Sequence, residues 1–136
     1  MKNNLFVIDT NTLISAFLFK YSTPRKAFEK AVKKGRVCSS FKTYDEFSEV
    51  LLRSKFDKYI SPEEKLLALK QFKELTLFGE ISKTITDCRD PKDNKFLELA
   101  VSADASCIIT GDKDLLVLHP FRGIPILNAA DFLNDF

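Results

Sequence analysis

The segment LFVIDTNT, residues 5–12, decides the fold class of this chain. Its first half is an unbroken apolar run with β-branched residues, which is typical of a short strand buried on both faces of a sheet. Its second half starts with Asp9 and consists of side chains that favour the N-terminus of a helix. A buried strand that passes directly into a helix predicts an α/β fold with a parallel sheet.

The rest of the sequence repeats this alternation of strand and helix. Further strands are predicted at residues 37–39, 81–85, 107–109 and 124–127. Helices are predicted over residues 13–19, from Ser22 to a stop at Gly35, over 43–52, from the capping box at 61–64 to Gly79, from Pro91 to 101, and over 129–133. The pattern predicts a three-layer α/β/α fold with a central, mostly parallel sheet, and residues 1–136 are interpreted as one domain.

Composition and charge restrict the class of protein. The chain carries 21 basic and 19 acidic residues, and a formal charge of +2 does not by itself indicate nucleic-acid binding. The three cysteines, Cys38, Cys88 and Cys107, have no zinc-ligand spacing, and free thiols suit a reducing compartment. The N-terminus shows no signal or membrane segment. We therefore expect a cytoplasmic protein without a membrane partner.

Acidic residues follow the predicted strands. Asp9 ends the first strand, Asp112 follows the strand at 107–109, and Asp90 and Asp93 precede the helix that begins near Pro91. Aspartate also caps helices and fills turns, and any single one of these residues is explained in that way. Ligands of open parallel sheets, however, bind at the carboxyl ends of the strands. Two strands that deliver aspartates to the same edge, with an acidic loop nearby, favour one shared site.

A cluster of carboxylates favours a metal centre. Without a cation the carboxylates repel one another and raise each other's pKa. A hard divalent ion such as Mg²⁺ takes oxygen ligands and binds through a few carboxylates together with substrate phosphate. With one histidine and no cysteine pair, the chain is poorly suited to zinc. The pattern predicts Mg²⁺ or Mn²⁺ and the chemistry of phosphate esters.

Four segments, in order along nearly the whole chain, resemble the motifs of the PIN-domain family. They are IDTN at residues 8–11, EFSEVL at 46–51, RDPKD at 89–93 followed by FLELA at 96–100, and TGDKDLL at 110–116. A single D-T-N would be weak, but the four segments together are specific. The resemblance is nearest to the subgroup described as toxins of prokaryotic toxin–antitoxin pairs.

The resemblance implies a Mg²⁺- or Mn²⁺-dependent endoribonuclease that cleaves single-stranded RNA. It gives catalytic and metal-binding roles to Asp9, Glu46, Asp93 and Asp112, and adds Asp90 as a further metal-binding acid. An ion held by Asp9, Asp93 and Asp112 would polarise the scissile phosphate and activate water, and a second ion near Glu46 would stabilise the leaving oxygen.

Neighbouring residues receive supporting roles from the same resemblance. Thr10, Asn11 and Thr110 would orient the carboxylates or the attacking water. Asp114 is expected to cap the short helix that follows Asp112. Glu49 lies one turn after Glu46 on nearly the same helix face and is its nearest competitor.

Basic and aromatic residues suggest partners. The basic residues that flank the acids are expected to contact RNA phosphates, and they are Arg89, Lys92, Lys95 and Lys113. His119 is interpreted as a surface residue. Phe17, Phe19 and Tyr21 are candidates for contact with a partner or a second copy. The family resemblance implies a cognate antitoxin and a homodimer.

One alternative of a different class stays open, which is a non-catalytic RNA- or protein-binding module with the same fold. The acids at all four positions favour the enzyme. Metal-dependent RNA cleavage that is lost in Asp9→Asn would discriminate between the two.

Overall fold

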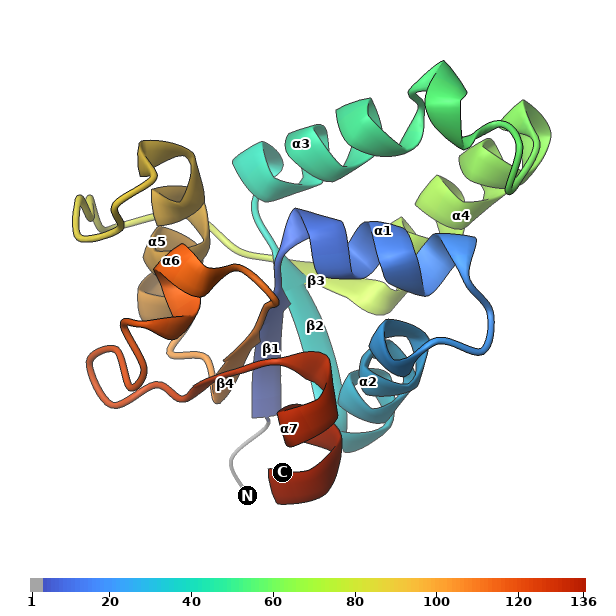
Figure 1. Cartoon of the computed structure of the whole chain (residues 1–136). Helices are drawn as coiled ribbons and strands as arrows, with labels where there is room; N and C mark the ends of the chain where they lie inside the picture. Colours follow the sequence, from blue (N-terminus) through green and yellow to red (C-terminus); the bar gives the residue numbers. More distant parts are fainter. Residues whose placement is uncertain (1–3) are drawn as a thin grey trace.

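The computed structural model describes residues 4–136 and places the decisive apolar run at the centre of a sheet (Figure 1). This central strand, β1 (Asn4–Ile8), lies between β2 (Gly35–Ser39) and β4 (Cys107–Ile109). The outer strands are β3 (Thr76–Phe78) and β5 (Ile126–Leu127). Within the described residues the sheet has five strands in the order β3-β2-β1-β4-β5, and all four pairings are parallel. The predicted α/β fold with a parallel sheet is confirmed.

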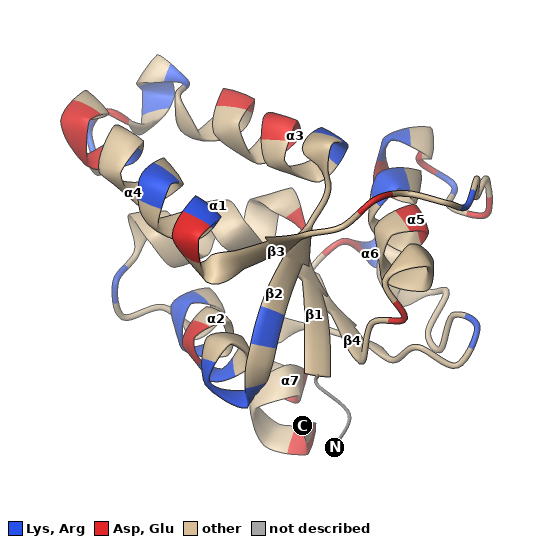
Figure 2. Ribbon diagram, turned by 180° about the vertical axis from the view of Figure 1, so that it is seen from behind, with Lys and Arg blue, Asp and Glu red and all other residues tan. Residues whose placement is uncertain are grey.

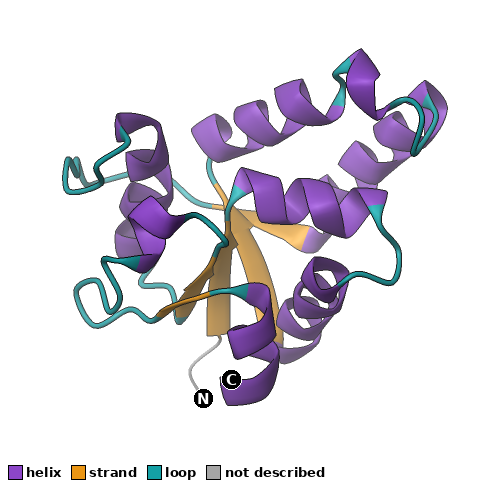
Figure 3. Cartoon of the chain, in the orientation of Figure 1, coloured by secondary structure: helices purple, strands orange, loops and turns teal. Residues whose placement is uncertain are grey.

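Helices cover both faces of this sheet (Figure 3). They are α1 (Thr10–Leu18), α2 (Thr23–Lys34), α3 (Phe41–Leu51), α4 (Pro62–Leu75), α5 (Asn94–Ser102), α6 (Lys113–Leu116) and α7 (Ala129–Asp135), with short 3₁₀ helices at Ser54–Phe56 and Pro91–Asp93. Helices α5 and α6 lie on one face, and the others lie on the opposite face. No helix within residues 4–136 combines the length and the apolar character needed to cross a bilayer.

The side-chain alternation of β1 divides the core into two clusters. Phe6 and Ile8 face the cluster formed with α1, α2, α3, α4 and α7, whereas Val7 faces the cluster formed with α5 and α6. All three side chains are at most 4% exposed. A strand buried on both faces needs apolar residues at every position, which is why the run is unbroken rather than alternating.

Local capping signals fix where several helices begin. Ser22 and Ser61 cap α2 and α4, and Ser61 exchanges hydrogen bonds with Glu64 in the predicted capping box. Gly35 ends α2, also as predicted, and begins β2. A Cβ atom at Gly35 would lie 2.0 Å from the backbone oxygen of Asn4, so the close pairing of β1 with β2 requires glycine there.

The predicted strand at residues 81–85 is wrong, and so is the helix end at Gly79. Helix α4 ends at Leu75, and the next three residues form β3 at the edge of the sheet. In residues 81–85, the backbone N–H groups of Ser82 and Ile85 donate to side-chain oxygens of Ser102 and Glu98 on α5. The segment therefore runs along α5. Its backbone N–H groups bond to side chains of that helix instead of to a neighbouring strand.

The chain order creates a crevice at one edge of the sheet. After β1 the chain builds β2 and β3 on one side, and it then crosses β1 to build β4 and β5 on the other side. The connections that leave β1 and β4 therefore diverge at their carboxyl ends, which is where open α/β sheets bind ligands. The N–H group of Asp9 donates to the carbonyl of Ile109 at 3.1 Å, so the ends of the two strands are in register.

Candidate metal centre

The predicted acids converge on one cavity of about 210 Å³ at the carboxyl ends of β1 and β4. Its lining combines acidic, polar and apolar side chains from four separate parts of the chain. The lining residues are Asp9, Thr10, Asn11, Glu46, Val50, Asp90, Lys92, Asp93, Phe96 and Asp112. The structure thus brings together all five acids that the sequence singled out.

Asp9 is a buried carboxylate, only 5% exposed, between β1 and α1. Its Oδ1 accepts the N–H group of Thr12 at 3.0 Å and so caps α1. Its Oδ2 accepts the hydroxyl of Thr110 at 2.5 Å. Burial raises the pKa of Asp9, and the hydrogen bonds from Thr110 and Thr12 act against that rise. The carboxylate is therefore held rigidly in a place where its charge is poorly solvated.

Thr110 links this carboxylate to the next one. Its fully buried hydroxyl, besides donating to Asp9, accepts the N–H group of Asp112 at 3.0 Å. Asp112 in turn accepts the N–H group of Asp114 at 2.8 Å and caps α6. The expectation that Asp114 caps this helix is wrong, because the helix begins at Lys113 and Asp114 lies in its first turn.

Asp93 faces Asp112 from the start of α5. Burial, a hydrogen bond with Asp112 and repulsion from Asp112 and Asp90 raise the pKa of Asp93 to about 7, and Lys95 acts in the opposite direction. Its Oδ2 atom is buried and has no hydrogen-bond partner among the described residues. Within residues 4–136 there is also no ion pair to Asp9, Asp93 or Asp112. This half of the cavity therefore crowds three acidic side chains together without an ion pair to any of them.

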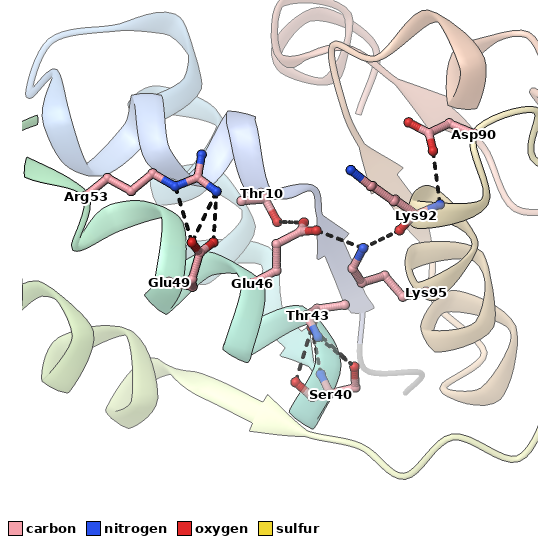
Figure 4. Close-up of polar contacts among 9 residues, drawn as sticks. All are labelled: Thr10, Ser40, Thr43, Glu46, Glu49, Arg53, Asp90, Lys92 and Lys95. Carbon is pink, nitrogen blue, oxygen red and sulfur yellow. Dashed lines mark hydrogen bonds and ion pairs between the residues drawn. The ribbon is translucent and has the colours of Figure 1, made fainter. Parts of the chain in front are cut away.

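Glu46 reaches the cavity from α3, and both of its oxygens are engaged (Figure 4). Oε1 accepts the hydroxyl of Thr10, and Oε2 lies 2.8 Å from Nζ of Lys95. Glu49 instead forms an exposed ion pair with Arg53 at 3.0 Å. The structure therefore places Glu46, and not its neighbour one turn later, with the other acids.

The remaining predicted residues occupy the rim of the cavity. Asp90 accepts the N–H group of Lys92 at 3.1 Å and caps the 3₁₀ helix, while Asn11 is exposed at the cavity. Arg89 is 85% exposed and pairs with Asp114 at 3.0 Å, and Lys113 is exposed. Away from the cavity, His119 is exposed as predicted, and its Nδ1 accepts the N–H group of Ile126.

Three features of the cavity were missed by sequence reasoning. Val50 and Phe96 form an apolar part of the wall, and Lys95, which is not itself among the lining residues, pairs with Glu46 from behind the lining. The apolar stripes of α3 and α5 could have suggested the wall. No local pattern could have shown the contact of Lys95, because its partner lies far away in the sequence.

The donor set fits a hard divalent ion. Carboxylate and hydroxyl oxygens dominate the lining, as Mg²⁺ and Mn²⁺ prefer. The buried, unpartnered Oδ2 of Asp93 is an acceptor that a cation would satisfy. Among the described residues, no three Asp, Glu, His or Cys side chains stand close enough to form a finished metal cage.

Comparison with known proteins places the chain in a family. Residues 6–114 match the sequence model of the PIN domain. An uncharacterized protein of Methanocaldococcus jannaschii is 36% identical over 120 residues, a match that covers 83% of this chain and 74% of that protein.

Solved structures share the fold. One similar structure is a chain of VapBC2 from Rickettsia felis, which was solved bound to a DNA fragment from its promoter. The alignment has a TM-score of 0.61 and 13% identity, and it covers 91% of this chain and 98% of the VapBC2 chain. PAE2754 from Pyrobaculum aerophilum aligns with a TM-score of 0.61 and 15% identity over 96% of this chain and 88% of its own. At these identities the likeness concerns the fold alone.

Proposed function

We propose, since this chain belongs to the PIN-domain family, that it is a Mg²⁺- or Mn²⁺-dependent endoribonuclease that hydrolyses single-stranded RNA. One observation carries the proposal, which is the convergence of Asp9, Asp93 and Asp112 on one cavity without an ion pair, with one buried carboxylate oxygen unpartnered. Asp9 and Asp112 cap helices, but the proximity of the three carboxylates to one another destabilises the fold and favours binding of a divalent ion.

Asp9, Asp93 and Asp112 would hold the ion, with Asp90 beside them at the rim. When bound, the ion would supply positive charge to a phosphodiester and favour attack by water. Thr110 serves this site by fixing Asp9 and the backbone of Asp112 with a single hydroxyl.

Other side chains would contact the RNA backbone. The exposed amide of Asn11 stands at the cavity and can donate to a phosphate oxygen or to the attacking water. Lys92 lines the cavity and adds positive charge beside the acids, and Arg89 and Lys113 extend that charge outward. Figure 2 shows basic and acidic positions interleaved along the segment that leads into α5. Such a rim would attract the RNA backbone without neutralising the acids.

Cleavage is expected to depend strictly on a divalent ion. Purified protein incubated with a labelled single-stranded RNA should produce fragments with Mn²⁺ or Mg²⁺, none with excess EDTA, and fragments again when Mn²⁺ is restored. A perfectly paired duplex of the same sequence is the control and should stay intact. If the protein binds Mn²⁺ but leaves the single strand uncut, the non-catalytic RNA- or protein-binding module becomes the better explanation.

A toxin role, with a cognate antitoxin and a homodimer, is the finer part of the proposal. It is supported by the motif resemblance and by a cavity of about 290 Å³, lined by residues of α1, α4 and their neighbours, in which apolar side chains such as Leu18, Ile60 and Leu67 stand beside polar ones such as Arg25 and Glu64. Tyr21, in the loop after α1, is 82% exposed, and Phe19 is 42% exposed. Phe17 lines this cavity, and its ring packs against Phe28 and Phe47. An apolar segment of an antitoxin would cover this surface.

Expression of the chain alone in a bacterial host tests the toxin role. We expect wild type to arrest growth and Asp9→Asn, produced at the same level, to leave growth normal. Arrest by both forms would show toxicity unrelated to the carboxylate site. Normal growth with wild type that still cleaves RNA in vitro would favour a nuclease that is not a toxin.

A further inference from the structure

Glu46 differs from the other acids of the cavity because the chain itself compensates its charge. Oε1 accepts the hydroxyl of Thr10, and Oε2 lies 2.8 Å from the ammonium of Lys95. No such ion pair forms, among the described residues, with Asp9, Asp93 or Asp112. The cavity therefore has one side without an ion pair, formed by these three aspartates, and one side, at Glu46, where a lysine forms one.

Lys95 is held firmly in this place. It lies in the first turn of α5, and its side chain is only 16% exposed, against 30% for Glu46. Its ammonium also donates to the backbone oxygen of Lys92, as Figure 4 shows. Two acceptors from different parts of the chain thus fix the ammonium beside the carboxylate, unlike an exposed ion pair on a protein surface.

We propose that Lys95 is a built-in cation of this metal centre, and that the chain consequently binds one divalent ion, on the side of Asp9, Asp93 and Asp112, rather than two. The inference rests on the proposed function only for the existence of that one ion. It replaces the second ion that the family resemblance suggested near Glu46.

Charge and desolvation favour this division. A divalent ion at Glu46 would have to separate the carboxylate from Lys95 and leave a largely buried ammonium next to a second positive charge. On the other side an ion would enter a cavity lined by Asp9, Asp93 and Asp112, with the unpartnered Oδ2 of Asp93 as an acceptor, and it would break no ion pair. Binding of the ion at the three aspartates therefore leaves neither Lys95 nor Glu46 without its partner of opposite charge.

Lys95 acts in this arrangement as a positioning residue. It keeps Glu46 turned toward Thr10, the residue that directly follows Asp9 and begins α1. A lysine also differs from an ion in a testable way, because chelators cannot remove it. Glu46 should therefore keep its place when metal is removed from the protein.

Calorimetric titration of the metal-free, full-length protein with Mn²⁺ tests the proposal through stoichiometry, without any measurement of cleavage. Wild type and Lys95→Arg should bind one Mn²⁺ per chain. Lys95→Met exposes the carboxylate of Glu46 and should bind a second, weaker Mn²⁺, whereas Lys95→Met combined with Glu46→Gln should return to one. Lys83→Met removes an exposed lysine outside the site and is the matched control for charge, expected to keep one ion.

The outcomes separate this inference from the proposed function. Two Mn²⁺ per wild-type chain, or a single Mn²⁺ in folded Lys95→Met, would overturn the role of Lys95 and leave the nuclease proposal standing. No Mn²⁺ binding by wild type would overturn both. If Lys95→Met does not fold, Lys95→Gln takes its place, with the same expected second Mn²⁺ and the same overturning result.

Discussion

Asp9→Asn is expected to lower the rate of RNA cleavage about a thousandfold or more, which corresponds to about 4 kcal/mol of transition-state stabilisation. Asp9 is the most buried of the acids, and Thr110 and Thr12 hold its two oxygens in fixed directions. An asparagine keeps the shape of the side chain but removes the charge that a divalent ion needs. The loss should appear in the single-turnover rate and, in parallel, as weaker Mn²⁺ binding.

The variant should still fold, which makes the result interpretable. Asparagine caps helices as well as aspartate does and can still accept the N–H group of Thr12. Asp135→Asn, an exposed change in α7, is the matched control and should cleave at the wild-type rate. Cleavage by folded Asp9→Asn at that same rate would place the reaction elsewhere in the molecule.

Asp93→Asn is expected to make the metal-free protein more stable, even though it removes a proposed metal ligand. The pKa of Asp93 is raised from 3.8 to about 7, so its ionised form costs free energy in the folded state. A shift of this size corresponds to at most about 4 kcal/mol, and partial exposure of Asp93 to solvent reduces the expected gain to about 1–2 kcal/mol. The melting temperature at pH 8 should rise by about 5 °C.

The gain should depend on pH in one direction. Below pH 4 the carboxyl group is protonated in both the folded and the unfolded chain, and it costs the wild type nothing. As the pH rises from 4 to 7, the unfolded chain releases this proton while the folded chain retains it, so the wild type loses stability relative to the variant. Above pH 7 the difference should stay constant. Thermal melts of both proteins with EDTA, at a series of pH values, measure it.

Addition of Mg²⁺ should reverse the order of the melting temperatures of wild type and Asp93→Asn. Mg²⁺ is expected to raise the melting temperature of wild type more than that of Asp93→Asn, because the variant binds the ion less tightly. Asp112→Asn should also be more stable without metal, because it removes the charge that repels Asp93. Asparagine can still cap α6 in the same way. Asp87→Asn, an exposed change in the loop before the site, should alter neither melt. A metal-free Asp93→Asn that melts below wild type at pH 8 would contradict the crowded acidic site.

Part of the fold and site was predictable from local sequence. The proximity of Asp9 and Asp112 was predictable because each follows an apolar run. Parallel strands that pair side by side end at the same edge of a sheet. Strand β3 was not predictable. It is three residues long, and its conformation depends on pairing with β2, where Thr76 lies opposite Val37, rather than on its own pattern.

The sequence by itself determined the α/β class, the family, and the set of acids at the strand ends, because the signals for all three are carried by residues close together along the chain. The tertiary structure alone decided that Glu46, the glutamate of the motif, lies with these acids while Glu49 does not. It also decided that Lys95 pairs with Glu46. Glu46 and Glu49 differ by one helical turn, and their roles separate only when α3 packs beside α1 and α5. The ion pair of Lys95 with Glu46 and the raised pKa of Asp93 arise from charges on different elements that folding brings into a shared, poorly solvated space.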